Sequence, residues 1–240
     1  MILGHLINHL KAANWLTAFI ELLVVVVGVY GAFELERWGE ERREARHEQV
    51  LLEQLHGEII LAIPVMEEQV QNFVDTLTGV QQVASILMQD AGSGELDSSQ
   101  CSDVFSVSIL RFTPLTLTSL EEMASSGMHS QLDDQELKTL LFILQRHTKA
   151  LISFMQLVLP QQVILMDVYP ELIPRGVDSD GVSFMNCDTD GMRTNQGFIN
   201  HLMSDFGRYR GLSYRLGRQL ETLAEIHIRL DYLLEISHTE

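Results

Sequence analysis

The sequence has few of the residues that mark disulfide-rich secreted scaffolds. It contains only two cysteines among its 240 residues, Cys101 and Cys187, and no C-x-x-C motif. Two distant cysteines do not make a disulfide framework, so the sequence leaves open whether they form one disulfide or remain two thiols. A disulfide is expected only if this part of the chain is exported to an oxidising compartment.

Basic residues are scarce as well. The chain has 16 Lys and Arg against 33 Asp and Glu, which gives a formal net charge of −17. Residues 1–46 contribute only −1, so almost all of the negative charge lies in residues 47–240. An acidic domain is repelled by nucleic acids and by anionic lipid surfaces. We therefore exclude nucleic acid as a partner.

The common catalytic and nucleotide-binding motifs are absent. There is no G-x-S-x-G, Walker, Rossmann or H-E-x-x-H motif. Residues 186–191 match the first half of a calcium loop, but Gly197 stands where the bidentate Glu is needed, so a helix-capping turn explains them better. His5 and His9 have the spacing of a metal pair without a third ligand, and five histidines scattered through the domain show no metal spacing: His129, His147, His201, His227 and His238. We expect no catalytic residue, no metal and no cofactor, and we expect the protein not to be an enzyme.

The longest apolar run is residues 15–33, in which only Glu21 is charged. As a helix it would extend roughly 28 Å, close to the thickness of the bilayer's hydrocarbon core. We predict a transmembrane helix over residues 15–36, with Trp15 and Trp38 at the two interfaces. A cleaved signal peptide fits less well, because the run is long and few basic residues precede it.

Helical periodicity dominates the rest of the chain. Residues 1–14 predict an interfacial helix, residues 37–92 a long helix continuing from the span, and residues 93–240 the remainder of a helical bundle that packs with residues 47–92. The fold class is therefore all-α. Apolar stripes over residues 50–88 and 197–235 predict an antiparallel, coiled-coil-like pair.

Local signals place the shorter elements. Pro64 should kink or interrupt the long helix, and Pro160 should bend or end a helix that begins at Asp133 or Asp134. Residues 118–121 predict a capping box, with Gly127 ending that helix.

We expect a loop over residues 89–99, a short helix and an extended link over residues 101–117, an irregular stretch over residues 170–195, and a final helix over residues 196–236.

The span also carries candidate contact residues, namely Glu21, Gly28, Gly31 and Ala32. A carboxylate within the bilayer is costly and points to a function. We favour a contact with a second helix, either in a homo-oligomer or in another membrane protein, over a snorkelling Glu without a role and over a proton path. The lipid bilayer is the other expected partner.

The domain has one concentration of basic residues. It could bind an anionic ligand, although pairing with acidic residues on an adjacent helix is more common. Its members are Arg208, Arg210, Arg215 and Arg218.

The span combines Glu21, Val24, Val25, Gly28, Ala32, Trp38, Glu40 and Arg42. At these positions it resembles the span of a family of uncharacterised bacterial single-span membrane proteins, which reads G-E-I-x-L-V-V-x-G-I-x-x-A-L-Q-x-x-N-W-N-E-x-R. Glu34 and Gly39 stand where the family usually has Gln and Asn. A second patch, residues 119–127 followed by 134–138, is similar to the family's T-x-E-E-L-x-S-S-G and D-P-E-L-R.

Two observations disagree about the side of the membrane on which the domain lies. Lys11 precedes the span and four arginines follow it, which favours a cytoplasmic domain. The resemblance implies the reverse, because family members commonly begin with a basic segment. We expect a protein of the bacterial inner membrane with a periplasmic domain.

The sequence therefore favours a membrane-anchored scaffold or accessory subunit that acts by protein–protein association. The alternatives are an accessory element of an ion-conducting or proton-driven complex that uses Glu21, and a ligand sensor with an exported domain.

Overall fold

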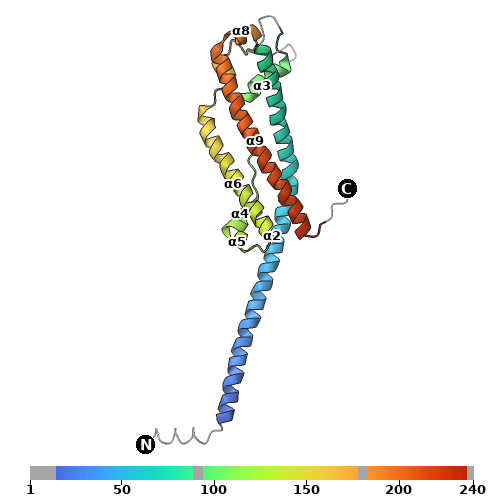
Figure 1. The fold of residues 1–240 in the computed structure, drawn as a ribbon, viewed down its shortest axis with the longest axis vertical. Coiled ribbons are helices and arrows are strands. Elements are labelled where there is room, and N and C mark those ends of the chain that lie inside the picture. The colour runs from blue at the N-terminus through green and yellow to red at the C-terminus, as the bar shows by residue number, and fades with distance from the viewer. Residues whose placement is uncertain (1–14, 89–93, 178–182, 237–240) are drawn as a thin grey trace, which may run out of the picture. The chain divides into compact units, whose positions relative to one another are not determined.

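The computed structural model describes residues 15–88, 94–177 and 183–236. These residues form helices joined by short links, and one small two-stranded sheet (Figure 1). The predicted all-α class is confirmed. The contacts divide the chain into two units, Met1–Leu51 and Leu52–Glu240.

Helix α2 runs from Trp15 to Leu87 without a break, so it contains the predicted span and most of the predicted helix over residues 37–92. Pro64, which was predicted to kink or interrupt this helix, lies inside it and does not interrupt it. Pro64 lies on the exposed side of the helix, and Ile59 and Met66 are buried in the core on either side of it. The predicted interfacial helix over residues 1–14 lies outside the described residues.

The predicted antiparallel pairing of the two long stripes is confirmed. The part of α2 after residue 52 contacts α9, Gln196–Leu233. The rings of Phe73 and Tyr209 lie 4.4 Å apart, and Nε2 of His56 lies 2.7 Å from Oδ1 of Asp231, so the two helices run in opposite directions. Leucines at helical spacing on α9 are buried because this face lies in the core: Leu202, Leu212, Leu216, Leu223 and Leu230.

Helix α6, Gln135–Val158, packs along α9 as the third long helix of the bundle (Figure 1). Asp134 caps it, as predicted, by accepting a hydrogen bond of 2.7 Å from the backbone N–H of Leu137. The same carboxylate accepts a hydrogen bond from Nε of Arg229 on α9, and this bond lowers the pKa of Asp134. Helix α6 ends before Pro160, which lies in the 3₁₀ turn η1, Leu159–Gln161.

Helix α4, Thr118–Ser125, does not have the predicted capping box, because its N-cap is Leu117. Its N-terminus is capped from another helix instead. The carboxylate of Glu58 on α2 accepts hydrogen bonds from the backbone N–H of Ser119, at 3.2 Å, and from its hydroxyl, at 2.9 Å. Gly127 follows α4 with φ of +76°, the left-handed conformation that was predicted for the end of this helix. A short helix α5, Met128–Gln131, comes next.

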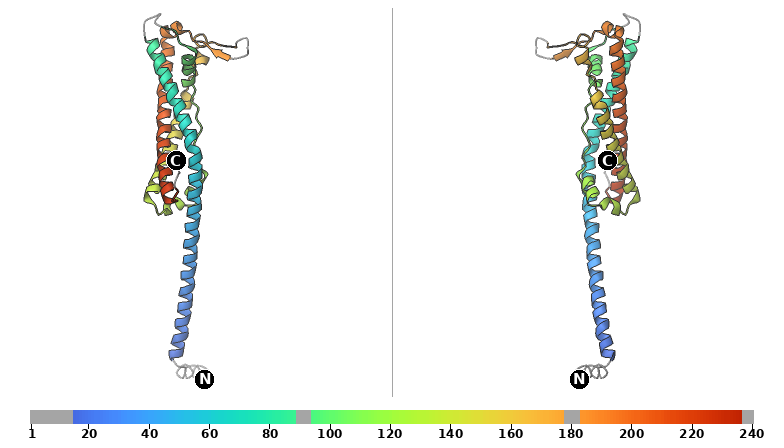
Figure 2. Two further views of the ribbon diagram at one scale, coloured as in Figure 1. Left: turned by 90° about the vertical axis from the view of Figure 1, so that its right-hand side faces the viewer. Right: turned by 90° about the vertical axis from the view of Figure 1, so that its left-hand side faces the viewer.

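The remaining elements lie at one end of the bundle. Helix α3, Ser98–Val107, and the extended link that follows it were both predicted. The described parts of residues 170–195 contain more regular secondary structure than predicted. After helix α7, Leu165–Val168, they contain the antiparallel strands β1, Arg175–Val177, and β2, Ser183–Met185, and then helix α8, Thr189–Thr194. This hairpin projects from the end of the bundle (Figure 2). Three-residue strands are too short for sequence alternation to identify.

Candidate functional site

The first unit presents an unusually apolar helical surface. From residue 19 to residue 35, its large apolar side chains are between 48 % and 70 % exposed. Single exposed apolar residues are ordinary on a protein surface, but a continuous run of this kind marks a contact with lipid or protein. The members of this run are Phe19, Ile20, Leu22, Leu23, Val24, Val25, Val26, Val27, Val29, Tyr30, Phe33 and Leu35.

Three of the four predicted contact residues share one face of α2. With about 100° of rotation per residue, Glu21, Gly28 and Ala32 fall within an arc of about 40°. All three are exposed. Gly31 lies about 60° from Gly28 and is half-buried. A Cβ atom added at Gly28 or Gly31 would meet no atom within 4 Å, so neither glycine is required by packing within this chain.

Of the two tryptophans predicted to lie at the membrane interfaces, Trp15 and Trp38, the structure describes the side chain of Trp38 only. Trp38 is 53 % exposed, and the guanidinium group of Arg42 lies 3.8 Å from the centre of its ring. An aromatic ring and a cation side by side suit the headgroup level of a bilayer. Trp15 begins α2, but its side chain lies outside the described residues.

One helical stretch in the described part of the chain is long and apolar enough to cross a membrane, and it is residues Gln135–Val168, with a mean hydropathy of 1.5. Only 22 % of its most apolar window is buried. It is nevertheless built as a bundle helix. Leu137, Leu141 and Leu144 line its buried side, and Thr148 accepts a hydrogen bond of 2.7 Å from the Gln219 side chain of α9. A stretch that is broken into α6, η1 and α7 and tied to α9 in this way belongs to the domain.

The four arginines of α9 do not converge on a common anion site. Arg208 binds Asp205 at 2.6 Å, and Arg218 binds Glu221 at 2.5 Å, each three residues away on the same helix. Arg215 lies 4.0 Å from the ring centre of Phe154 on α6, and Arg210 lies against Phe206. The observed carboxylate partners of this cluster are on α9 itself and not on an adjacent helix.

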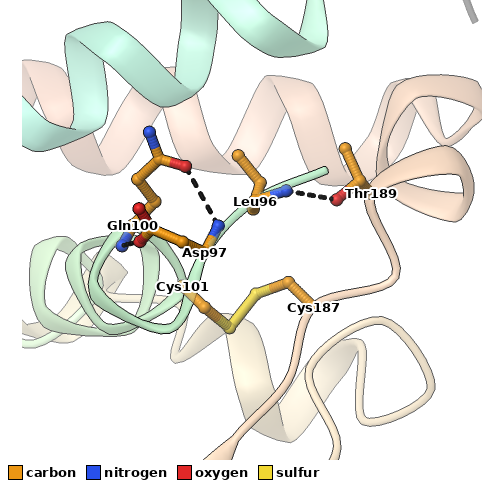
Figure 3. Close-up of a disulfide and its surroundings, with 6 residues drawn as sticks. All are labelled: Leu96, Asp97, Gln100, Cys101, Cys187 and Thr189. Atoms are coloured by element: carbon orange, nitrogen blue, oxygen red, sulfur yellow. Dashed lines mark hydrogen bonds between the residues drawn. A yellow bond between two sulfur atoms is a disulfide. The ribbon is translucent and has the colours of Figure 1, made fainter. Parts of the chain in front are cut away.

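Cys101 on α3 and Cys187 before α8 form a disulfide (Figure 3). The bond joins two segments that are 86 residues apart. A hydrogen bond of 2.9 Å from the backbone N–H of Leu96 to the hydroxyl of Thr189 joins the same two segments. Asp97 and Gln100 form a reciprocal capping box at the start of α3, which orients Cys101 toward its partner. The sequence left this pairing open.

Residues 186–191, the partial calcium loop, serve as a helix cap. Asp188 is the N-cap of α8 and accepts a hydrogen bond of 2.9 Å from the backbone N–H of Gly191. Asp190 pairs with Arg193 at 2.6 Å. These contacts agree with the capping turn that the sequence favoured.

Asp205 is a buried carboxylate in α9, and only 2 % of the residue is exposed. Its Oδ1 accepts a hydrogen bond from Arg208, while its Oδ2 has no hydrogen-bond partner within the described residues. Burial raises its pKa from 3.8 to about 6, although the positive charge of Arg208 opposes the shift. The folded protein therefore binds this proton more tightly than the unfolded chain does.

Asp205→Asn should show this linkage. As the pH rises from about 4 to about 6.5, the unfolded carboxyl ionises first, so the wild-type protein loses stability that the variant keeps. Over this pH range the unfolding free energy of the wild type should fall, relative to that of the variant, by up to about 3 kcal/mol. This follows from about 1.4 kcal/mol per pKa unit. Denaturant titrations of both proteins across this range measure it. Asp190→Asn is the matched control, because Asp190 makes the same three-residue pair at 2.6 Å with a side chain that is 75 % exposed. A constant difference between wild type and Asp205→Asn would contradict this assignment.

His56, His227 and Asp231 form a cluster between α2 and α9 that the sequence analysis did not bring together. His227 and Asp231 are one helical turn apart, but His56 is 171 residues before His227 in the chain. The only local signal is the H-x-x-x-D spacing, which many helices contain by chance. Recognising the cluster requires the register of the antiparallel pair.

A groove of about 360 Å³ lies between residues 115–124 and α6. Its walls are mainly aliphatic, and the polar side chains of its lining, such as Glu121 and Gln145, do not form an acid–base pair or a nucleophile with a base. The groove is therefore a hydrophobic recess. Its aliphatic lining consists of Leu115, Leu117, Leu120, Ala124, Leu144 and Ile152.

No family model, no curated protein and no solved structure matches the chain.

Proposed function

We propose that this protein is a membrane-anchored helical scaffold or accessory subunit that acts by protein–protein association. In this proposal residues 15–36 span the bacterial inner membrane, and the helical domain stands in the periplasm. The observation that carries it is the continuous run of exposed apolar side chains on α2. Each large apolar side chain contributes about 1.5–3 kcal/mol when it leaves water, so this run favours lipid strongly.

The disulfide supports the periplasmic orientation. Structural disulfides form and persist in oxidising compartments and are rare in the cytosol. The Cys101–Cys187 bond lies in the domain, on the carboxyl-terminal side of the span. Long domains cross the membrane largely regardless of flanking charge, so the arginines after the span do not oppose this orientation.

The face of Glu21, Gly28 and Ala32 supports association. Small residues on one face allow two helix backbones to approach closely. A carboxylate placed among lipid chains is costly, and a polar group of a second helix offsets that cost. A homo-oligomer or another membrane protein with a small, polar helix face fits this surface.

Glu21 also supports a second candidate, an accessory role in a proton-driven or ion-conducting complex, because it is exposed on α2. It is the only charged residue of residues 15–33, so a proton path would need further ionisable groups from a partner. Glu21→Gln separates the two roles. A transport role predicts lost activity with intact assembly, whereas the association role predicts weakened assembly.

The anchoring part of the proposal is tested by membrane extraction and protease access. The double substitution of Val24 and Val26 by lysine should cost roughly 5–7 kcal/mol of insertion energy and move the protein out of the carbonate-resistant membrane fraction. The matched control replaces Val50 and Val65 by lysine. These two valines are 48 % and 55 % exposed, and they lie on the same helix outside the span. That control should stay in the membrane.

Protease added to intact spheroplasts should digest the wild-type domain, because the domain is proposed to face the periplasm. A domain that resists protease until the membrane is permeabilised would overturn the orientation. Full extraction of the wild-type protein by carbonate would overturn the anchor.

A further inference from the structure

We propose that His56, His227 and Asp231 form a binding site for a divalent transition-metal ion, with Zn²⁺ as the ion that suits it best. Two imidazole nitrogens and one carboxylate oxygen meet between α2 and α9, and these three atoms all lie within 4.8 Å of one another. The site is separate from the proposed membrane contact on residues 15–36, and it gives the domain a function beyond association.

The distances are close to those of a zinc site. With Zn–N and Zn–O bonds of about 2.0–2.1 Å and tetrahedral angles, neighbouring ligand atoms lie about 3.3 Å apart. Nε2 of His56 lies 2.7 Å from Oδ1 of Asp231, and Nε2 of His227 lies 3.7 Å from the same oxygen. Equal separation around one ion requires the two distances to Asp231 to change by about 0.4–0.6 Å, and the distance between the two imidazole nitrogens, which is at most 4.8 Å, to shorten by up to about 1.5 Å.

The helices hold the three ligands in place. His227 and Asp231 are four residues apart on α9, so they project from the same face one turn apart. His56 comes from the antiparallel α2, and its ring stacks on the ring of His227 with centroids 5.1 Å apart and planes inclined by 17°. This arrangement limits the rotation of both imidazoles before any ion binds, which reduces the entropic cost of assembling the site.

The burial of the site suits a resident ion. The side chains of His56, Asp231 and His227 are 8 %, 18 % and 23 % exposed, respectively. The three side chains are therefore mostly shielded by protein, and Asp231 and His227 keep some access to solvent. In the ion-free form the hydrogen bond between His56 and Asp231 occupies these groups. An ion would replace that bond with two coordinate bonds.

The donor set selects the class of metal. Imidazole nitrogen is a good ligand for Zn²⁺, Ni²⁺ and Cu²⁺, whereas Ca²⁺ and Mg²⁺ require shells of oxygen ligands. Three protein ligands are too few for the closed four-ligand site of a zinc finger and leave one coordination position open. Because the ligands come from two helices, a bound ion would link α2 to α9.

Isothermal titration of the full chain in detergent with ZnCl₂, and the visible absorption of Co²⁺ as a probe of geometry, test the site. The starting protein should carry His5→Gln and His9→Gln and a purification tag without histidine, so that no second histidine pair competes. We expect saturable 1:1 binding, a tetrahedral Co²⁺ spectrum that Zn²⁺ displaces, and a higher unfolding temperature with Zn²⁺.

His227→Gln and Asp231→Asn should each weaken Zn²⁺ binding at least tenfold and remove the increase in unfolding temperature. His201→Gln is the matched control, because His201 is also on α9 but its Nδ1 lies 2.9 Å from the hydroxyl of Tyr169. Circular dichroism verifies that each variant is folded, and His56→Gln replaces any variant that is not. Absence of saturable binding by the starting protein, or equal binding by folded ligand variants and the control, would overturn the proposal.

Discussion

Replacing Cys101 and Cys187 by serine is expected to lower the free energy of unfolding of the domain by about 4–5 kcal/mol. The disulfide closes a loop between residues 86 positions apart, and in the chain-entropy description a loop of that length restricts the unfolded chain by this amount. Both cysteines are buried, at 1 % and 9 % exposure, so the serines would also place hydroxyl groups in the core. Urea denaturation of the full chain in detergent, monitored by circular dichroism, measures the loss.

Reduction of the wild-type protein provides the control for this effect. Dithiothreitol should reduce wild-type stability toward that of the double-serine variant and should leave the variant unchanged. Oxidised and reduced wild type differ only in the covalent bond, so their comparison separates its effect from that of the serine hydroxyl groups. If the variant and the oxidised wild type unfold within about 1 kcal/mol of each other, the disulfide does not stabilise the domain as argued here.

Replacing Gly28 by leucine is expected to weaken self-association, or association with the native partner, at least tenfold, which is about 1.4 kcal/mol. The leucine side chain would separate the two helix backbones that are proposed to meet at the face of Glu21, Gly28 and Ala32. Apart from the adjoining stretch of its own helix, no atom of the chain lies within 4 Å of a Cβ atom added at Gly28, so the folding of the monomer should not change. Energy transfer between labelled copies in liposomes, or recovery of the partner from native membranes, measures the association.

Val26→Leu is the matched control for this substitution. Val26 is 57 % exposed and lies about 160° around the helix from Gly28, so it is on the opposite side of α2. The Val26→Leu variant should associate as strongly as the wild type does. Equal weakening by both substitutions would mean that the span responds to side-chain volume in general, and unchanged association by Gly28→Leu would remove this face from the account.

The parts of the fold that were predictable depend on local chemistry repeated over many residues. The stripes of α2 and α9 repeat every three or four positions for about forty residues, so their pairing was visible in the sequence. Asp134 and Gly127 mark helix ends by a capping side chain and by a left-handed backbone conformation, which are properties of single residue types.

The features that were not predictable depend on partners distant in the chain. Thr118 and Glu121 have the spacing of a capping box, but Glu58, 61 residues away from Ser119, caps α4 instead. The partners in the disulfide and in the cluster of His56, His227 and Asp231 are also far apart in the sequence, so the sequence alone did not predict either feature. These pairings depend on the register between elements, which composition and periodicity do not specify.

The central claim is that α2 meets another protein within the membrane through one face. Site-specific photo-crosslinking in living cells tests it most directly, with the crosslinking residue placed in turn at each position from 21 to 33. We expect crosslinked species that recur with helical periodicity, strongest at positions 21, 25, 28 and 32 and weakest at 23, 26 and 30. Crosslinks to lipid alone at every position, or protein crosslinks of equal strength around the whole helix, would contradict it.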